Sequence, residues 1–109
     1  MHLLFVCSRN QWRSPTAERI FSSRSGIVAK SAGTANSART KLNADMLRWA
    51  NIVFVMERKH QQIIRQLYPA LYSNLNLVVL DIEDNYGYMD DELIELLEQS
   101  IAPYLENVQ

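Results

Sequence analysis

Short apolar runs alternate with amphipathic segments along most of the chain. Four runs have the length and the Val/Leu/Ile content of buried parallel strands: Leu3–Cys7, Val28–Ala32, Ile52–Met56 and Leu77–Leu80. Between and after them, apolar positions recur every three or four residues, which predicts helices over Pro15–Ser23, Asn43–Ala50, Glu57–Leu67 and Asp90–Tyr104. This alternation predicts an α/β fold with a parallel sheet and helices on both of its faces.

The apolar stripes of these helices are interpreted as core rather than as cofactor sites. In the third helix the stripe is His60, Ile63, Ile64 and Leu67, and in the last it is Leu93, Leu96, Leu97, Ile101 and Tyr104. A histidine on an inward stripe is more often a core or boundary residue than a catalytic base, so we expect a structural role for His60.

Composition narrows the class of protein. The chain has 109 residues, which fits a single α/β domain over 1–109, and a formal net charge of −1, which argues against a nucleic-acid binder. One cysteine excludes an internal disulfide framework and fits a reducing cytoplasm. Because no leader-like segment or membrane-length apolar run is visible, we expect a cytoplasmic protein without a membrane partner.

The candidate chemistry lies in the turn between the first predicted strand and the first predicted helix. Cys7 ends the strand, and Arg13 follows after five residues. A loop of that length wraps around a tetrahedral oxyanion with its N–H groups inward, while the helix N-terminus adds positive potential. A thiolate, the reactive form of cysteine, is favoured at a helix N-terminus beside an arginine. The spacing thus predicts a phosphate cradle with a nucleophilic sulfur at its floor.

Each residue type in this turn has a chemical reason to be there. Arg13 can hold two oxygens of a phosphoryl group at once, and the hydroxyl of Ser14 is placed to donate to the sulfur of Cys7. No His/Cys/Asp cluster has metal-ligand spacing, so we predict neither a metal nor a cofactor. The alternative at this point is a buried structural cysteine followed by an ordinary helix start.

The segment from Val6 to Glu18 closely resembles the phosphate-loop signature of the low-molecular-weight protein tyrosine phosphatases. Three later segments are similar to landmarks of that family in the same order: Ser31–Thr34, Ile52–Glu57 and Glu83–Tyr86. The resemblance implies a three-layer α/β/α fold with a four-stranded parallel sheet in the order 2-1-3-4 and the phosphate loop after the first strand. It also implies hydrolysis of phosphomonoesters through a thiophosphoryl-enzyme intermediate on Cys7, on phosphotyrosine or another aryl phosphate.

Hydrolysis of this kind needs an acid to protonate the leaving group. The acidic candidates after the fourth strand are Asp81, Glu83, Asp84 and Asp90. The resemblance aligns Asp84 with the general acid of the family's Asp-Pro-Tyr segment, and Asp81 is the runner-up. The alternative is a solvated acidic loop leading into the acidic first turn of the last helix.

The remaining candidates for phosphate or substrate binding are Ser8, Arg9, Asn10, Gln11, Trp12, Ser14 and Tyr86. Asn10 tolerates the left-handed backbone conformation, and the resemblance implies that it braces the loop. Ser31 is either a hydrogen-bond partner of Asn10 or simply a strand-end serine. Tyr86 follows the candidate acid, where an aromatic ring can line the mouth of the pocket.

This chain departs from the family pattern at several positions. Arg9 stands where the family usually has glycine, Trp12 where it usually has a second cysteine, and Asn85 where it usually has proline. Only Ala35–Lys41 joins the second strand to the next helix, so part of the wall that selects the substrate is expected to be missing. The reaction type therefore carries over better than the substrate.

Three functions are compatible with these residues. The first is a metal-independent phosphatase acting on a phosphorylated protein or a small aryl phosphate, with inorganic phosphate or sulfate able to occupy the loop. The second is a phosphate- or phosphopeptide-binding module with little turnover. The third is an arsenate reductase, which would need an external thiol because Cys7 is the single cysteine.

Overall fold

The computed structural model describes residues 1–105. Its elements in chain order are β1 (His2–Cys7), α1 (Arg13–Ser22), β2 (Val28–Gly33), α2 (Ala44–Trp49), β3 (Ile52–Val55), α3 (Arg58–Leu67), α4 (Pro69–Tyr72), β4 (Leu77–Val79), α5 (Asp91–Ile101) and a 3₁₀ turn, η1 (Ala102–Leu105). The four strands form one parallel sheet in the order β2-β1-β3-β4. The predicted fold class and strand order are confirmed.

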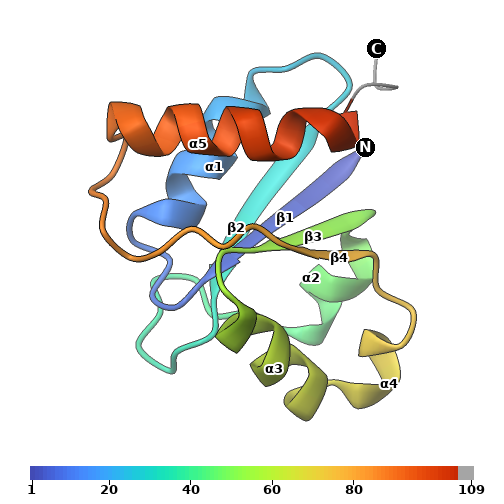
Figure 1. The fold of residues 1–109 in the computed structure, drawn as a ribbon. Helices are drawn as coiled ribbons and strands as arrows, with labels where there is room; N and C mark the ends of the chain where they lie inside the picture. Colours follow the sequence, from blue (N-terminus) through green and yellow to red (C-terminus); the bar gives the residue numbers. More distant parts are fainter. Residues whose placement is uncertain (106–109) are drawn as a thin grey trace.

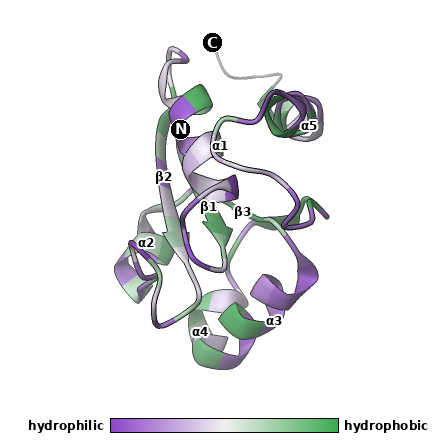
Figure 2. Ribbon diagram, turned by 90° about the vertical axis from the view of Figure 1, so that its left-hand side faces the viewer, coloured by the Kyte–Doolittle hydropathy of each residue, from purple (hydrophilic) through white to green (hydrophobic). Residues whose placement is uncertain are grey.

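The helices lie in two layers, one on each face of the sheet. Figure 1 shows α1 and α5 on one side and α2, α3 and α4 on the other. Figure 2, turned by 90°, shows the apolar strand β1 between these two layers. None of the helices within residues 1–105 is long and apolar enough to cross a membrane.

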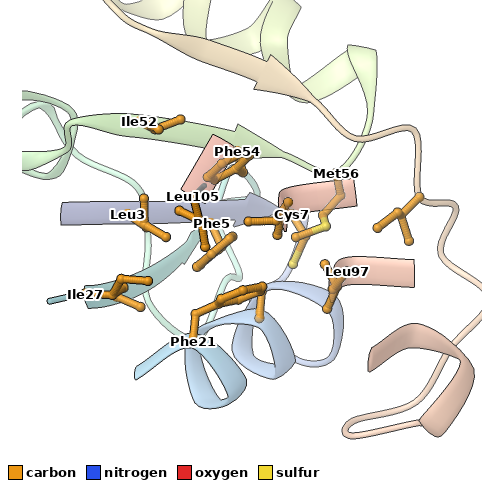
Figure 3. Packing of buried hydrophobic residues seen from close by; sticks show 14 of the residues in the cluster. Leu3, Phe5, Cys7, Phe21, Ile27, Ile52, Phe54, Met56, Leu97 and Leu105 are labelled. Atoms are coloured by element: carbon orange, nitrogen blue, oxygen red, sulfur yellow. The ribbon is translucent and has the colours of Figure 1, made fainter. Parts of the chain in front are cut away.

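Alternate residues of β1 supply two separate cores. Leu3, Phe5 and Cys7 face α1 and α5, where they join a cluster that includes Phe21 and Leu97 (Figure 3). The residues between them, Leu4 and Val6, face the other layer. There they pack in a second cluster with Leu47 of α2 and Ile64 of α3. Burial on both faces explains why this strand is apolar throughout rather than alternating in polarity.

The predicted element ends differ from the observed ones by one or two residues in most cases, and α4 was not predicted. The helix α1 begins at Arg13 instead of Pro15, because proline is tolerated anywhere in a first turn, where N–H groups have no intrahelical partner. The helix α4 is a single turn that starts at Pro69, too short to produce a periodic pattern. At the other end of the chain, α5 stops at Ile101 because Pro103 cannot donate to the helix ladder.

Two residues assigned to buried stripes are exposed. Leu67, at the end of α3, is 59% exposed, because Tyr68 and Leu71 of the following turn pack against the core in its place. Tyr104 is 45% exposed. It lies in η1, where one edge of its ring still packs against Phe54 of the core, with 5.5 Å between the ring centroids, while Leu105 is buried.

Candidate active site

The loop between β1 and α1 holds the predicted cradle. Cys7 is the last residue of β1, and α1 begins at Arg13, so five residues form the loop. Asn10, in the middle, has a φ of 56°, the left-handed conformation that the sequence predicted for it. The φ angle of Arg9 is not positive. The position where the family usually has glycine therefore accepts a side chain without backbone strain.

A small pocket of about 60 Å³ opens over this loop. Its lining residues are Cys7, Ser8, Arg9, Gln11, Trp12, Arg13 and Asp84. A water molecule takes up about 30 Å³ in the liquid, so the pocket has room for a small anion. Seven of the ten predicted site residues therefore meet at one pocket, and the other three, Asn10, Ser14 and Tyr86, do not line it.

A chain of hydrogen bonds leads from the sulfur into the protein. Ser14 Oγ lies 2.9 Å from Cys7 Sγ and accepts a hydrogen bond from Asn10 Nδ2 at 3.0 Å. Asn10 Nδ2 also donates to Ser31 Oγ at 2.8 Å, and Ser31 Oγ donates to Glu18 Oε1 at 2.5 Å. The Ser14 hydroxyl accepts from Asn10 and has two acceptors for its own proton, the sulfur at 2.9 Å and the Ala32 carbonyl oxygen at 3.4 Å, of which the sulfur is the nearer. This arrangement stabilises a negative charge on Cys7 Sγ.

Arg13 is held by groups from two distant parts of the chain. Its Nη1 donates to Glu57 Oε2 at 2.5 Å and to the carbonyl oxygen of Ile82 at 2.8 Å. Its Nε lies 3.6 Å from Asp84 Oδ1. The guanidinium is almost fully buried, so these contacts fix its plane at the pocket wall and compensate for the loss of water.

Glu57 and His60 form a reciprocal cap at the start of α3. The Glu57 carboxylate accepts from the backbone N–H of His60, and His60 Nδ1 accepts from the backbone N–H of Glu57 at 3.0 Å. Burial acts to raise the pKa of Glu57, but the hydrogen bond and the positive charge of Arg13 outweigh it and leave that pKa below its ordinary value. Glu57 is thus an ionised partner for Arg13 at neutral pH.

The four acidic candidates are separated by their positions. Asp84, whose side chain is 53% exposed, is the one that lines the pocket. Asp81 and Glu83 line a different depression beside Glu57. Asp90 caps α5 by accepting from the backbone N–H of Glu92 at 2.9 Å, as the solvated-loop alternative expected. Within residues 1–105, no three His, Cys, Asp or Glu side chains gather as a metal site would require.

The end of β2 presses against the loop from behind. A Cβ on Gly33 would lie 2.5 Å from the carbonyl oxygen of Ser8 and 2.6 Å from Ala38 Cβ, so only glycine fits. The short segment after β2 then adds hydrogen bonds: Arg39 Nε donates to the Asn10 carbonyl oxygen at 3.1 Å, and the Ala35 N–H donates to that of Ser8 at 2.9 Å. The short Ala35–Lys41 connection thus supports the cradle directly.

The aromatic candidates differ in position. Trp12 is 47% exposed and stands at the rim of the pocket. Tyr86 is absent from the pocket lining and packs against the core cluster beneath α5. Thr16 links the cradle loop to the segment between β4 and α5, because its Oγ1 donates to the Trp12 carbonyl oxygen and accepts from the Met89 N–H at 2.9 Å.

Sequence reasoning did not identify Glu57, Thr16 or the contact of His60 with the loop. His60 was expected to be structural, and its Nε2 lies 2.9 Å from Ser8 Oγ. A usable signal was present for Glu57, because it follows a parallel strand on the same sheet edge as Cys7.

The burial of His60 predicts a loss of stability in mild acid. Burial and the positive charge of Arg13 lower the pKa of His60 from 6.5 to about 4. Between pH 6.5 and 4, His60 is therefore protonated in the unfolded chain but stays neutral in the folded chain. The free energy of unfolding should fall by about 3 kcal/mol over that range. Urea denaturation at pH 7, 5 and 4 measures this.

The matched control is His60→Gln, which cannot titrate. It should lose less stability than the wild type between pH 6.5 and 4. An equal loss in both proteins would assign the acid sensitivity to other groups. Glu57 acts at lower pH, because a lowered carboxyl pKa costs stability only as pH falls below its ordinary 4.5.

The chain is similar to known phosphatases, both in its match to a family model and in its fold. The family model for "Low molecular weight phosphotyrosine protein phosphatase" matches residues 2–92. No curated protein sequence matches the chain.

Several solved structures share the fold. The YwlE arginine phosphatase of Geobacillus stearothermophilus is 23% identical, with a TM-score of 0.76 over 96% of this chain and 92% of that one. The tyrosine phosphatase Wzb of Escherichia coli K30, solved in complex with phosphate, is 23% identical, with a TM-score of 0.75 over 99% and 98%. The tyrosine phosphatase AmsI of Erwinia amylovora is 25% identical, with a TM-score of 0.72 over 96% and 91%.

Proposed function

The chain belongs to the low molecular weight phosphotyrosine protein phosphatase family, and from that membership we propose that it hydrolyses aryl phosphomonoesters, phosphotyrosine among them, through a phosphocysteine on Cys7. The observation that carries the proposal is the meeting of Cys7, Arg13 and Asp84 in one anion-sized pocket. Inorganic phosphate is then the product that occupies the same pocket.

In the first step the Cys7 thiolate attacks phosphorus. The P–S bond forms as the bond from phosphorus to the aryl oxygen breaks, and Asp84 gives its proton to that oxygen. Glu57 and the Ile82 carbonyl engage Nη1 of Arg13, and the other donors of the guanidinium are proposed to hold the equatorial oxygens of the phosphoryl group.

In the second step water attacks the phosphocysteine. Asp84, now ionised, takes a proton from the water, the P–S bond breaks, and phosphate leaves. The electron pair returns to the sulfur, where Ser14 Oγ, 2.9 Å away, stabilises the departing thiolate. The hydrogen-bonded chain behind Ser14 keeps that hydroxyl oriented in both steps.

The preference for aryl esters rests on the rim of the pocket. The exposed ring of Trp12 offers a flat apolar face on which an aromatic leaving group can stack. Tyr86 as a second aromatic contact stays a prediction, and so does a cytoplasmic location.

The test is hydrolysis of para-nitrophenyl phosphate and a phosphotyrosine peptide in the presence of a metal chelator. We expect turnover of both, with inorganic phosphate and vanadate as competitive inhibitors, because an oxyanion in the pocket excludes the substrate. Faster hydrolysis of a phosphoarginine peptide would contradict the aryl preference. Tight vanadate binding without turnover would favour the phosphate-binding module instead.

A further inference from the structure

His60 is completely buried, yet both of its ring nitrogens have partners. Its Nδ1 faces the backbone N–H of Glu57 at 3.0 Å, and its Nε2 faces Ser8 Oγ at 2.9 Å. One imidazole therefore connects the N-terminus of α3 with the first residue of the loop after Cys7. Because Ser8 lines the pocket, the connection ends at the proposed anion site.

The proton positions on this ring follow from its partners. A backbone N–H can only donate, so Nδ1 must be the unprotonated acceptor. In a neutral ring the single proton is then on Nε2, which donates to Ser8 Oγ. The pKa of His60, lowered to about 4 by burial and by Arg13, keeps the ring neutral at pH 7.

This tautomer assigns a direction to the Ser8 hydroxyl. Its oxygen accepts from His60, so its own proton must donate to a different group. Within the described chain, His60 is the hydrogen-bond partner of Ser8 Oγ, and Ser8 is one of the residues that line the pocket, so an anion bound there would offer an acceptor for that proton. The same tautomer excludes His60 as a base for Ser8, because Nε2 already carries its proton.

We propose that His60 is a positioning residue, which orients the hydroxyl of Ser8 as a hydrogen-bond donor to the oxyanion in the Cys7 pocket. The proposal rests on the proposed function in one respect, namely that a phosphoryl or phosphate oxyanion binds there. It adds a donor that the loop amides and Arg13 do not supply.

Two conservative substitutions separate positioning from simple capping. In His60→Gln the side-chain nitrogen replaces Nε2 and can still donate to Ser8, but the acceptor for the Glu57 N–H is lost. In His60→Asn the side-chain oxygen replaces Nδ1 and can still cap α3, but nothing reaches Ser8. Positioning thus predicts that Gln preserves anion binding and Asn does not, whereas a purely structural role predicts the opposite order.

The readout is the dissociation constant for inorganic phosphate, measured by titration calorimetry, which requires no turnover. We expect Ser8→Ala and His60→Asn each to weaken binding roughly 10-fold, as for loss of one hydrogen bond to a charged group, with His60→Gln within about 3-fold of the wild type. The double variant Ser8→Ala/His60→Asn should bind phosphate like Ser8→Ala alone, because His60 acts through Ser8.

Several results would overturn the proposal. If Ser8→Ala bound phosphate as tightly as the wild type, Ser8 would not be a donor to the anion. This variant deletes only one oxygen atom, so it tests the proposal even if the His60 variants do not fold. Additive losses in the double variant, or tighter binding by Asn than by Gln, would make His60 structural. Normal phosphate binding without phosphatase activity would instead reject the proposed function and leave this inference standing.

Discussion

Cys7→Ser protein is expected to bind inorganic phosphate and to turn over no measurable para-nitrophenyl phosphate, with kcat/KM lower by at least about 10⁴. The serine hydroxyl stays protonated at neutral pH in a site that stabilises a charged sulfur through Ser14. The loop, Arg13 and the rim are otherwise unchanged, so binding of the anion should survive. Steady-state kinetics and phosphate titration of the same preparation measure both quantities.

The matched control for this variant is Ser14→Ala, which removes the partner of the sulfur and leaves the nucleophile. Because the thiolate is then less stabilised both as nucleophile and as leaving group, a partial loss of kcat is expected, well short of that in Cys7→Ser. If Cys7→Ser kept full activity, the phosphocysteine mechanism would be rejected and the buried cysteine would be structural.

Asp84→Asn is expected to have the second largest effect, and the size should depend on the leaving group. Alkyl phosphates need a proton on the departing oxygen, so their kcat should fall about 10²- to 10⁴-fold. The para-nitrophenolate ion leaves with little help, so its release should slow far less. Comparing kcat for an alkyl and a nitrophenyl ester in both proteins gives the contrast.

Asp81→Asn is a matched control, since asparagine tolerates the left-handed backbone that Asp81 adopts, with a φ of 57°. Asp81 lies at a different depression from the pocket, so this variant should keep its activity on both esters. Equal losses for the two esters in Asp84→Asn would argue against Asp84 as the acid. A leaving-group-dependent loss in Asp81→Asn would transfer the role to Asp81.

The fold was largely predictable because three of the four strands contain continuous apolar runs, and the two central strands, β1 and β3, are almost wholly buried. The runs around Leu4, Val53 and Val78 are apolar without interruption, and each lies in a strand. The single turn of α4 and the exposure of Leu67 were not predictable, because they depend on which neighbouring side chain occupies the same space.

The cradle itself was predictable because its residues lie close together in the sequence. Cys7, Asn10 and Arg13 are separated by fixed numbers of residues in one loop, so the chain alone holds them within a few ångströms of each other. Asn10 adopts the left-handed conformation, as its residue type suggested. Local geometry of this kind needs no knowledge of the rest of the molecule.

The sequence by itself thus determined the strand-loop-helix unit with its sulfur and its guanidinium. The tertiary structure alone decided which distant groups meet that unit: Glu57 beside Arg13 and His60 beside Ser8. Asp84 lines the same pocket, and the family resemblance of its segment had already singled it out over Asp81. These partners lie 44 to 71 residues away along the chain, and their approach depends on the order and register of the parallel strands. No local pattern encodes that approach, because strand order comes from the packing of the whole sheet and its two helical layers.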